Sequence, residues 1–369
     1  MTKLFEDEAV GLMKVSLDRG IFKQIDVERV SAGAHYTEDD CWLVEPVVQF
    51  VLDLVANGRN VVVDPFAGDG HMLRAICEQF GINSAVGFDL NVDKWQKNDS
   101  LLAIPPISGA FICTNPPYLA KYSARRKGVL SLVERYFSES KYEDLYLVAI
   151  ERMLASGLPA VAIVPETFIA SGLFRSKLER VVILERRNPF STTDTPVCVA
   201  CFDPDLKKGH RVNCYRDGEL LGALESLEEG GKLDCDANSR RRLAFNVADG
   251  ALALKAVDGT APGDRIRFLR GDEFGYDVGM IKISSRLMTR IEVQDLPIDE
   301  LDNLIESANL ILEHVRSKTK DVVLSPFKGN NKAGIRRRRL DYRLARSIIA
   351  TALQKTSKGE VRFEQTALF

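Results

Sequence analysis

The sequence predicts an α/β fold, with a doubly wound, mostly parallel sheet followed by a C-terminal α+β domain. Between about residues 31 and 204, continuous apolar runs such as Val61–Val63 alternate with segments of helical periodicity. Strands of this character are buried on both faces, as in parallel sheets covered by helices. After Pro204 the pattern changes to short mixed strands and helices, which indicates a second domain.

Length and charge support two domains with different roles. A chain of 369 residues with 45% hydrophobic residues can form two cores. We expect a helical extension over residues 1–30, a first domain over 31–205 and a second domain over 206–369. Residues 236–369 carry 24 Lys and Arg against 18 Asp and Glu, although the whole chain has a net charge of −2. This asymmetry favours an anionic polymer as partner of the back half.

The first domain is expected to alternate helices and strands in a regular order. A helix from about Asp39 to Ala56 ends near Gly58, and the strand at Val61–Val63 leads through a glycine turn into a helix that ends near Gly81. The following apolar runs are "SAVGFDL", "GAFICT", "PAVAIVP", "VVILERRNPF" and "PVCVACFD", with the helical segment "YEDLYLVAIERMLASG" between the second and third.

The second domain is expected to begin with a hairpin that turns at Asp217-Gly218. Strands follow at "DRIRFLR" and "GMIKISS", then a helix at "DELDNLIESANLILEHVRSK". The chain closes with a basic segment, residues 335–354, which we expect to be helical.

Several classes of protein are disfavoured. We find no signal peptide and no apolar run of membrane-spanning length, and the seven cysteines are scattered, so we expect a cytoplasmic protein without a membrane partner. Cys198 and Cys201 form a lone C-x-x-C on a predicted strand, where residues three apart face opposite sides. We therefore predict two buried thiols and no metal site.

Distinctive residues follow three predicted strands. The segment "DPFAGDG" has glycines at Gly68 and Gly70, where the backbone can approach a ligand closely, and Asp89 ends the next strand. Asp99 is expected near the end of a third strand. The tetrapeptide "NPPY", Asn115 to Tyr118, follows the strand after that. In open α/β sheets, ligands bind at these carboxyl ends.

This combination resembles the S-adenosylmethionine-dependent DNA adenine-N6 methyltransferases in which the cofactor motif precedes the catalytic "NPPY" motif and a target recognition domain comes last. The resemblance covers about residues 31–204 and implies a seven-stranded methyltransferase sheet. It implies cofactor contacts from the loop, from the acids and from the upstream "AHYTEDD". The residues are Tyr36, Thr37, Asp64, Pro65, Phe66, Ala67, Gly68, Gly70, Asp89, Leu90, Asp99, Ser100 and Asn115.

The chemistry of "NPPY" fits the activity that this resemblance implies. The lone pair of an exocyclic amine is delocalised into the ring, so two acceptors aimed at its hydrogens make the nitrogen more nucleophilic. The Asn115 side-chain oxygen and the Pro116 carbonyl are candidate acceptors, because proline keeps its C=O. Pro116 and Pro117 restrict the loop, and Tyr118 offers a ring face for base stacking. Asn at the first position fits adenine better than cytosine in this family.

A paired base cannot reach such a pocket, so the resemblance implies that the target adenine is flipped out of the duplex. It nominates Phe190, in "RRNPFSTTDTPVCVACF", as a second aromatic against the flipped base; the alternative is a core phenylalanine. Basic residues are candidate contacts to double-stranded DNA: Lys121, Arg125, Arg126 and Lys127 after the tetrapeptide, and Lys332, Arg336, Arg337, Arg338 and Arg339 near the C-terminus.

The predicted activity is sequence-specific adenine methylation by the modification enzyme of a type II restriction–modification system, with a separate cognate endonuclease and a monomer rather than a dimer as the active form. Enzymes that methylate RNA bases or a release-factor glutamine share the loop and the tetrapeptide and remain alternatives, although 251 residues follow Tyr118 here. A non-catalytic nucleic-acid-binding module would be expected to have a broken motif. A dehydrogenase is disfavoured because Leu73 occupies the third glycine position.

Overall fold

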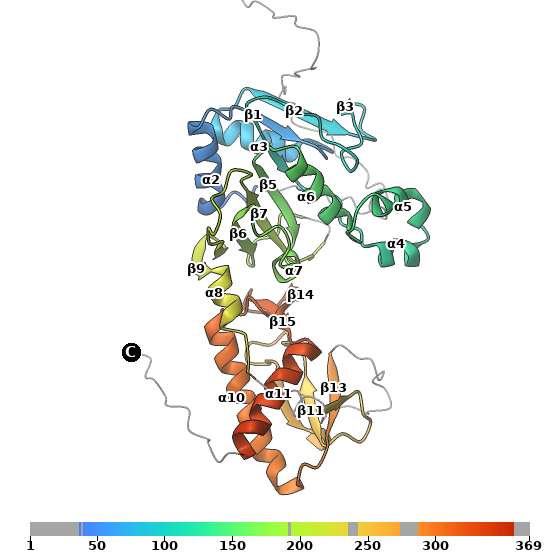
Figure 1. Ribbon diagram of the computed structural model, residues 1–369, viewed down its shortest axis with the longest axis vertical. Helices are drawn as coiled ribbons and strands as arrows, with labels where there is room; N and C mark the ends of the chain where they lie inside the picture. Colours follow the sequence, from blue (N-terminus) through green and yellow to red (C-terminus); the bar gives the residue numbers. More distant parts are fainter. Residues whose placement is uncertain (1–36, 38–39, 191–192, 235–242, 274–286, 358–369) are drawn as a thin grey trace, which may run out of the picture. The chain divides into compact units, whose positions relative to one another are not determined.

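The computed structural model describes residue 37 and residues 40–190, 193–234, 243–273 and 287–357. The predicted N-terminal helix over residues 1–30 and Tyr36 lie outside this part of the chain. Two compact units are present, Met1–Leu221 and Gly222–Phe369 (Figure 1).

A nine-stranded sheet forms the centre of the first unit, with the strand order β3-β2-β1-β4-β5-β7-β6-β8-β9. Its strands are β1 Val61–Asp64, β2 Ser84–Asp89, β3 Gln96–Lys97, β4 Ala110–Thr114, β5 Ala160–Pro165, β6 Leu178–Leu184, β7 Val197–Phe202, β8 Asn213–Arg216 and β9 Glu219–Ala223. Strands β3, β2, β1, β4 and β5 are parallel, and β7 runs antiparallel between β5 and β6. The mostly parallel sheet is confirmed, with two more strands than the seven expected.

Helices cover this sheet and complete the doubly wound α/β fold (Figure 1). They are α2 Glu45–Ala56, α3 His71–Phe80, α4 Lys121–Lys127, α5 Leu130–Ser138, α6 Leu145–Ala155 and α7 Phe168–Ser171. Apolar side chains of α2 and α3 pack with β1, β4, β5 and β7 in one core cluster, and α4, α5 and α6 share a second. Helix α2 begins at Glu45 rather than near Asp39, with Pro46 in its first turn, where a missing N–H costs no hydrogen bond.

The sheet continues beyond the predicted domain boundary. The change of pattern at Pro204 marks the end of β7, but β8 pairs in parallel with β6, so these residues still belong to the first unit. The division therefore falls after Leu221 and not at residue 205. The predicted hairpin is present: Asp217 and Gly218 both have positive φ, and the Asp217 carboxylate accepts hydrogen bonds from the N–H groups of Glu185 and Arg186.

The second unit is an α+β domain. Its elements are α8 Leu224–Glu229, β10 Leu243–Phe245, β11 Leu252–Lys255, β12 Arg267–Arg270, η1 Gly271–Glu273, β13 Met288–Val293, η3 Ile298–Glu300, α10 Leu301–Thr319, β14 Ser325–Asn330, β15 Arg336–Arg339 and α11 Tyr342–Ser357. Helices α10 and α11 pack on a four-stranded sheet of order β10-β13-β11-β12. Strand β12 and helix α10 match the prediction, whereas "GMIKISS" lies outside the described residues.

The prediction of one helix over residues 335–354 is wrong at its start. Arg336–Arg339 form strand β15, which pairs antiparallel with β14, and α11 begins only at Tyr342. Arginine has a good helix propensity, but the pairing with Ser325–Asn330 determines the local structure here. No helix within the described residues has the length and apolar character needed to cross a membrane.

Candidate functional site

A pocket of about 410 Å³ lies at the carboxyl ends of the first strands. The strand order reverses between β1 and β4, and ligands bind at this kind of position in open α/β sheets. The lining residues come from the last residues of β1 and β2, from the loops after β1, β2, β3 and β4, from α3 and α5, from the first residue of α6, and from Thr37 ahead of α2. They are Thr37, Asp64, Pro65, Phe66, Ala67, Gly68, Asp69, His71, Met72, Asp89, Leu90, Asn91, Val92, Asn98, Asp99, Ser100, Leu101, Asn115, Pro117, Leu132, Val133, Arg135, Tyr136 and Leu145.

The loop after β1 requires its two glycines. Gly68 has φ +48° and Gly70 has φ +78°, in the left-handed region where a side chain is strained. Gly70 also precedes α3, so the loop leads directly into a helix whose first residues, His71 and Met72, line the pocket. The positive end of the helix dipole therefore faces this cavity.

Asp64 links the ends of β1 and β4. Its Oδ1 accepts hydrogen bonds from Thr114 Oγ1 at 2.5 Å and from the Phe66 N–H at 3.0 Å. Burial raises the pKa of this carboxyl to about 7, despite the opposing effect of these two hydrogen bonds. Because Thr114 immediately precedes Asn115, the contact fixes the start of the tetrapeptide relative to the glycine loop.

Asp89 organises the backbone around the pocket. Its Oδ2 accepts the Gly68 N–H at 3.0 Å, and its Oδ1 accepts the N–H groups of Asn91 and Val92 at 2.8 and 3.0 Å. Leu90, directly after it, is exposed and lines the pocket. The carboxylate is thus held at the end of β2 with its orientation defined by the chain around it.

Asp99 and Ser100 lie directly after the short strand β3, as predicted, and both line the pocket. Asp99 Oδ2 accepts hydrogen bonds from Arg135 Nη2 at 2.6 Å and from the Tyr136 hydroxyl at 3.0 Å. Sequence reasoning missed Arg135 and Tyr136, which come from α5. No motif of the sequence marks these two residues, because their place in the pocket depends on the tertiary contact with Asp99.

Two residues of the tetrapeptide, Asn115 and Pro117, line the pocket, whereas Pro116 is buried. The Asn115 amide Nδ2 donates to Thr37 Oγ1 at 3.2 Å. Its Oδ1 lies 2.6 Å from the Tyr118 hydroxyl, which is also 2.7 Å from the Ile163 carbonyl. Burial keeps the pKa of this hydroxyl well above its usual value, so it remains a donor and can serve one of these acceptors at a time.

Two further aromatic rings surround Tyr118. Its ring meets Phe190 and Tyr146 edge to face, each with a centroid separation of 6.3 Å. Phe190 is only 3% exposed and packs in the core cluster shared with α2 and α3. Phe190 is therefore close to the tetrapeptide, as expected, but buried. Cys198 and Cys201 are likewise buried in β7, and the described residues contain no group of three metal-ligating side chains.

The basic residues after the tetrapeptide form helix α4. Arg125, Arg126 and Lys127 are exposed in its last turn, where positive charge also complements the helix dipole. Lys121 is half-buried and ion-paired with Glu143 at 3.5 Å. The exposed cations of α4 thus lie on a short helix, ten to twelve residues after Asn115.

The C-terminal arginines, which the sequence analysis nominates as DNA contacts, have a different environment. Along β15, Arg336 and Arg338 are buried and Arg337 and Arg339 are half-buried, because side chains alternate across a strand. Lys332, in the β14–β15 turn, is exposed. Side chains buried this deeply are not available to a surface ligand in this structure.

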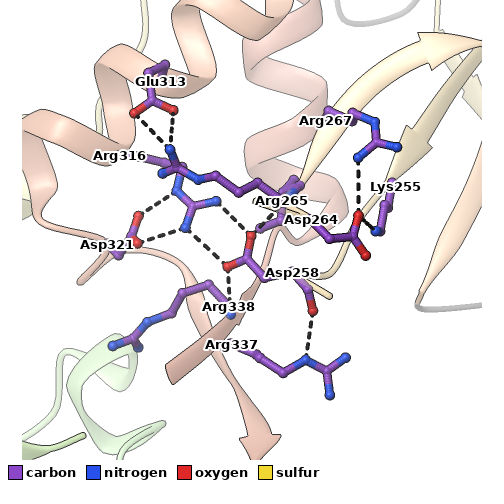
Figure 2. A network of polar contacts seen from close by, with 11 residues as sticks. Lys255, Asp258, Asp264, Arg265, Arg267, Glu313, Arg316, Asp321, Arg337 and Arg338 are labelled. Carbon is purple, nitrogen blue, oxygen red and sulfur yellow. Dashed lines mark hydrogen bonds and ion pairs between the residues drawn. The ribbon is translucent and has the colours of Figure 1, made fainter. Parts of the chain in front are cut away.

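Part of β15 belongs to an internal ion-pair network of the second unit (Figure 2). Arg316, from α10, pairs with both Asp258 and Asp321, and the Arg338 N–H donates to Asp258 Oδ2 at 3.0 Å. Arg337 Nε donates to the Asp258 carbonyl at 2.7 Å. Burial acts to raise the pKa of Asp258, but the hydrogen bonds from Arg316 and from backbone N–H groups lower it below its ordinary value.

No protein-family model and no curated protein matches the chain. Several solved structures resemble it weakly. A putative class I S-adenosylmethionine-dependent methyltransferase from Listeria monocytogenes is 13% identical over 48% of this chain and 67% of that one, with a TM-score of 0.29. A type I restriction–modification methyltransferase subunit from Streptococcus thermophilus is 16% identical over 50% of this chain, with a TM-score of 0.34.

The M protein of the type I restriction enzyme EcoKI is 12% identical over 86% of this chain and 71% of that one, with a TM-score of 0.31. The chain spans 48% of the Streptococcus subunit that it matches. Likenesses at such TM-scores do not by themselves establish an activity, which has to be argued from the residues of the site.

Proposed function

We propose that this chain transfers a methyl group from S-adenosylmethionine to the exocyclic N6 amine of an adenine in double-stranded DNA. One observation carries the proposal: a single pocket is lined both by the glycine loop with its acids and by Asn115 of the tetrapeptide. The proposed cofactor site and the Asn115 acceptor for an amine are thereby adjacent, as direct transfer between the two requires.

The residues of the pocket suit the cofactor. Asp89 and Asp99 offer carboxylate oxygens to ribose hydroxyls and to an adenine amine, with Ser100 and Leu90 beside them. The first turn of α3 favours the methionine carboxylate, and Gly68 lets the backbone approach closely. The volume of about 410 Å³ lies within the range of about 300–1,000 Å³ typical of small-molecule sites.

The bound cofactor would supply a methyl group on a positively charged sulfonium sulfur, which leaves readily as a neutral thioether. Asn115 Oδ1 and the Pro116 carbonyl would accept the two N–H groups of the target amine and direct its lone pair at the methyl carbon. The new N–C bond would form as the C–S bond breaks with its electrons on sulfur, and the amine would then lose one proton to solvent. This route needs no metal and no strong general base.

The target base would reach Asn115 only after it has left the duplex. Tyr118 is half-buried and its hydroxyl lies 2.6 Å from Asn115 Oδ1, so its ring is near the proposed acceptor, which supports a role in stacking the flipped base. Phe190 would have to move from the core to take part, since it is 3% exposed. We therefore assign the stacking role first to Tyr118.

Duplex DNA would be held by exposed cations. Arg125, Arg126 and Lys127 of α4 follow the tetrapeptide and are exposed, and we propose that they contact DNA phosphates. In the second unit, Lys332 is the most accessible of the predicted contacts, whereas Arg336 and Arg338 are buried. We propose that the second unit recognises the target sequence.

The biological setting proposed is a type II restriction–modification system in which this chain acts as a monomeric cytoplasmic modification enzyme beside a separate endonuclease. Sequencing that detects N6-methyladenine in DNA from cells that express the chain alone tests this part. Methylation confined to one short sequence is the expected result. A requirement for a further protein subunit would contradict it.

Incubation with labelled S-adenosylmethionine and a panel of substrates tests the class of target. The panel contains duplex DNA of varied sequence, bulk tRNA and rRNA, and a release factor with its glutamine motif. Label in duplex DNA alone is the expected result. Label in RNA or in the release factor, without label in DNA, would replace the proposed function by one of the alternative methyl-transfer reactions.

A further inference from the structure

Trp95 is a buried residue next to the pocket to which neither the sequence motifs nor the proposed reaction assigns a role. It lies between β2 and β3 and is 7% exposed. Its backbone N–H donates to the Val92 carbonyl at 3.1 Å. The segment from Asp89 thus folds back on itself and inserts an indole into the core cluster of α2 and α3. Trp95 does not belong to the described residues that line the pocket.

The indole ring packs against two glycines. A Cβ at Gly70 would lie 2.6 Å from Trp95 Cζ2, and a Cβ at Gly87 would overlap the same ring. Gly87 lies within β2 and has no positive φ, so backbone conformation does not explain a glycine there. The space for the tryptophan ring does explain it.

Trp95 also binds the glycine loop directly. Its Nε1–H donates to the Gly68 carbonyl at 2.7 Å, while Asp89 Oδ2 accepts the Gly68 N–H at 3.0 Å. Both polar groups of Gly68 are therefore bound by residues from the β2–β3 segment. Lys94 strengthens the arrangement, because its Nζ lies 4.6 Å from the centre of the Trp95 ring and donates to the Asp69 carbonyl at 3.3 Å.

From these contacts we infer that Trp95 is a positioning residue for the cofactor: it holds the glycine loop, from outside the pocket, in the conformation that receives S-adenosylmethionine. The inference rests on the proposed function. A loop with two residues in the left-handed region gains conformational freedom when its contacts are removed. Cofactor binding must then order the loop, and the lost entropy weakens the affinity. Trp95 acts through Gly68 and touches no reacting atom.

The substitution Trp95→Phe tests this role, because it keeps an aromatic ring between Gly70 and Gly87 but removes the donor to Gly68. We expect the Kd for S-adenosylmethionine, measured by calorimetry, to rise about three- to tenfold, the equivalent of one lost hydrogen bond. The KM for the cofactor should rise in parallel. We expect kcat at saturating cofactor and the KM for DNA to stay within about twofold of the wild-type values, because bound cofactor restores the loop.

Trp42→Phe is the matched control. Trp42 is the only other tryptophan of the chain, is fully buried in the same core cluster, and its Nε1 has no hydrogen-bond partner among the described residues. Removal of this N–H should leave the affinity for S-adenosylmethionine unchanged. Urea unfolding of both variants separates a loss of stability from a loss of binding.

A second measurement leaves Trp95 in place and follows its indole N–H directly in the wild-type protein. With the tryptophans labelled by ¹⁵N, the protein gives two indole N–H resonances, and Trp42→Phe leaves only that of Trp95. We expect the Trp95 resonance to shift on titration with S-adenosylmethionine and the Trp42 resonance to stay in place. A Trp95 resonance that does not respond to saturating cofactor would overturn the inference.

The outcomes distinguish the inference from the proposed function on which it rests. If the wild-type protein binds no S-adenosylmethionine, the proposed function fails. If the wild-type protein binds the cofactor and Trp95→Phe binds it equally well, the function stands and the role of Trp95 is refuted. Equal losses of affinity in Trp95→Phe and Trp42→Phe would also refute it, since the cause would then be packing of the core.

Discussion

At the scale of single residues, Asn115 depends on its neighbours for orientation. Its Nδ2 is bound to Thr37 and its Oδ1 to the Tyr118 hydroxyl. An amide with contacts on both sides has its oxygen and its nitrogen in defined positions, which makes it a specific acceptor. The tetrapeptide therefore contributes an orienting hydroxyl as well as an aromatic ring.

Tyr118→Phe isolates this hydroxyl. The ring remains for base stacking, but Asn115 loses one of its orienting contacts, so we expect kcat to fall about three- to tenfold, in line with the loss of one hydrogen bond. The affinity for S-adenosylmethionine should not change. The measurement is single-turnover methylation of duplex DNA, with Tyr122→Phe, at a tyrosine that is 72% exposed, as control. An unchanged rate in Tyr118→Phe would show that the hydroxyl does not orient Asn115.

Asp64 gives the stability of the protein a dependence on pH. Its pKa rises from 3.8 to about 7 on folding, so the folded state binds the proton more tightly. The stabilising contribution of the protonated form is complete below about pH 4 and is lost as the pH rises through 7. We expect Asp64→Asn, which cannot titrate, to reduce the decline in the free energy of unfolding between pH 5 and pH 8. Urea unfolding of the wild-type protein and of Asp64→Asn at both pH values measures this decline. An identical decline in both proteins would contradict the raised pKa of Asp64.

At the scale of elements, helix α4 is the most direct candidate for contact with the DNA backbone. Neutralising two of its exposed cations in Arg125→Gln/Arg126→Gln should weaken binding to duplex DNA and reduce the slope of log Kd against log salt concentration by about one to two. The affinity for S-adenosylmethionine should be unaffected. Lys207→Gln/Lys208→Gln, at two adjacent exposed lysines of the same unit, is the control. Equal effects of the two double variants would indicate a non-specific charge effect rather than a DNA contact at α4.

Sequence patterns predicted those elements whose own residues carry the signal, such as a run of apolar residues or a turn with glycine. The consecutive apolar residues of β1 and β4, the glycine loop and the Asp217-Gly218 hairpin all have such signals, and all are present. Strand β15 has no such local signal, because four arginines in a row are compatible with a helix or a strand. Its pairing with β14 and its hydrogen bonds to Asp258 determine that it is a strand. For the same reason the contribution of α5 to the pocket was not predictable, since it depends on a tertiary contact with Asp99.

At the scale of the whole molecule, two units with separate cores are present, and their boundary was predicted too early. The sequence after Pro204 is more polar because β8 and β9 lie at the edge of the sheet, where side chains are less buried than in β5 or β7. The residues that line the pocket are confined to the first unit. We therefore propose that the first unit carries out the chemistry and that the second unit recognises the target.

The central claim is that Asn115 and the pocket beside it methylate adenine in duplex DNA. The most direct measurement is mass spectrometry of nucleosides from duplex DNA incubated with S-adenosylmethionine and either the wild-type protein or Asn115→Ala. We expect N6-methyladenine with the wild-type protein, none with the variant, and the same cofactor affinity for both. No methylated base in DNA of varied sequence, or undiminished methylation by Asn115→Ala, would contradict the claim.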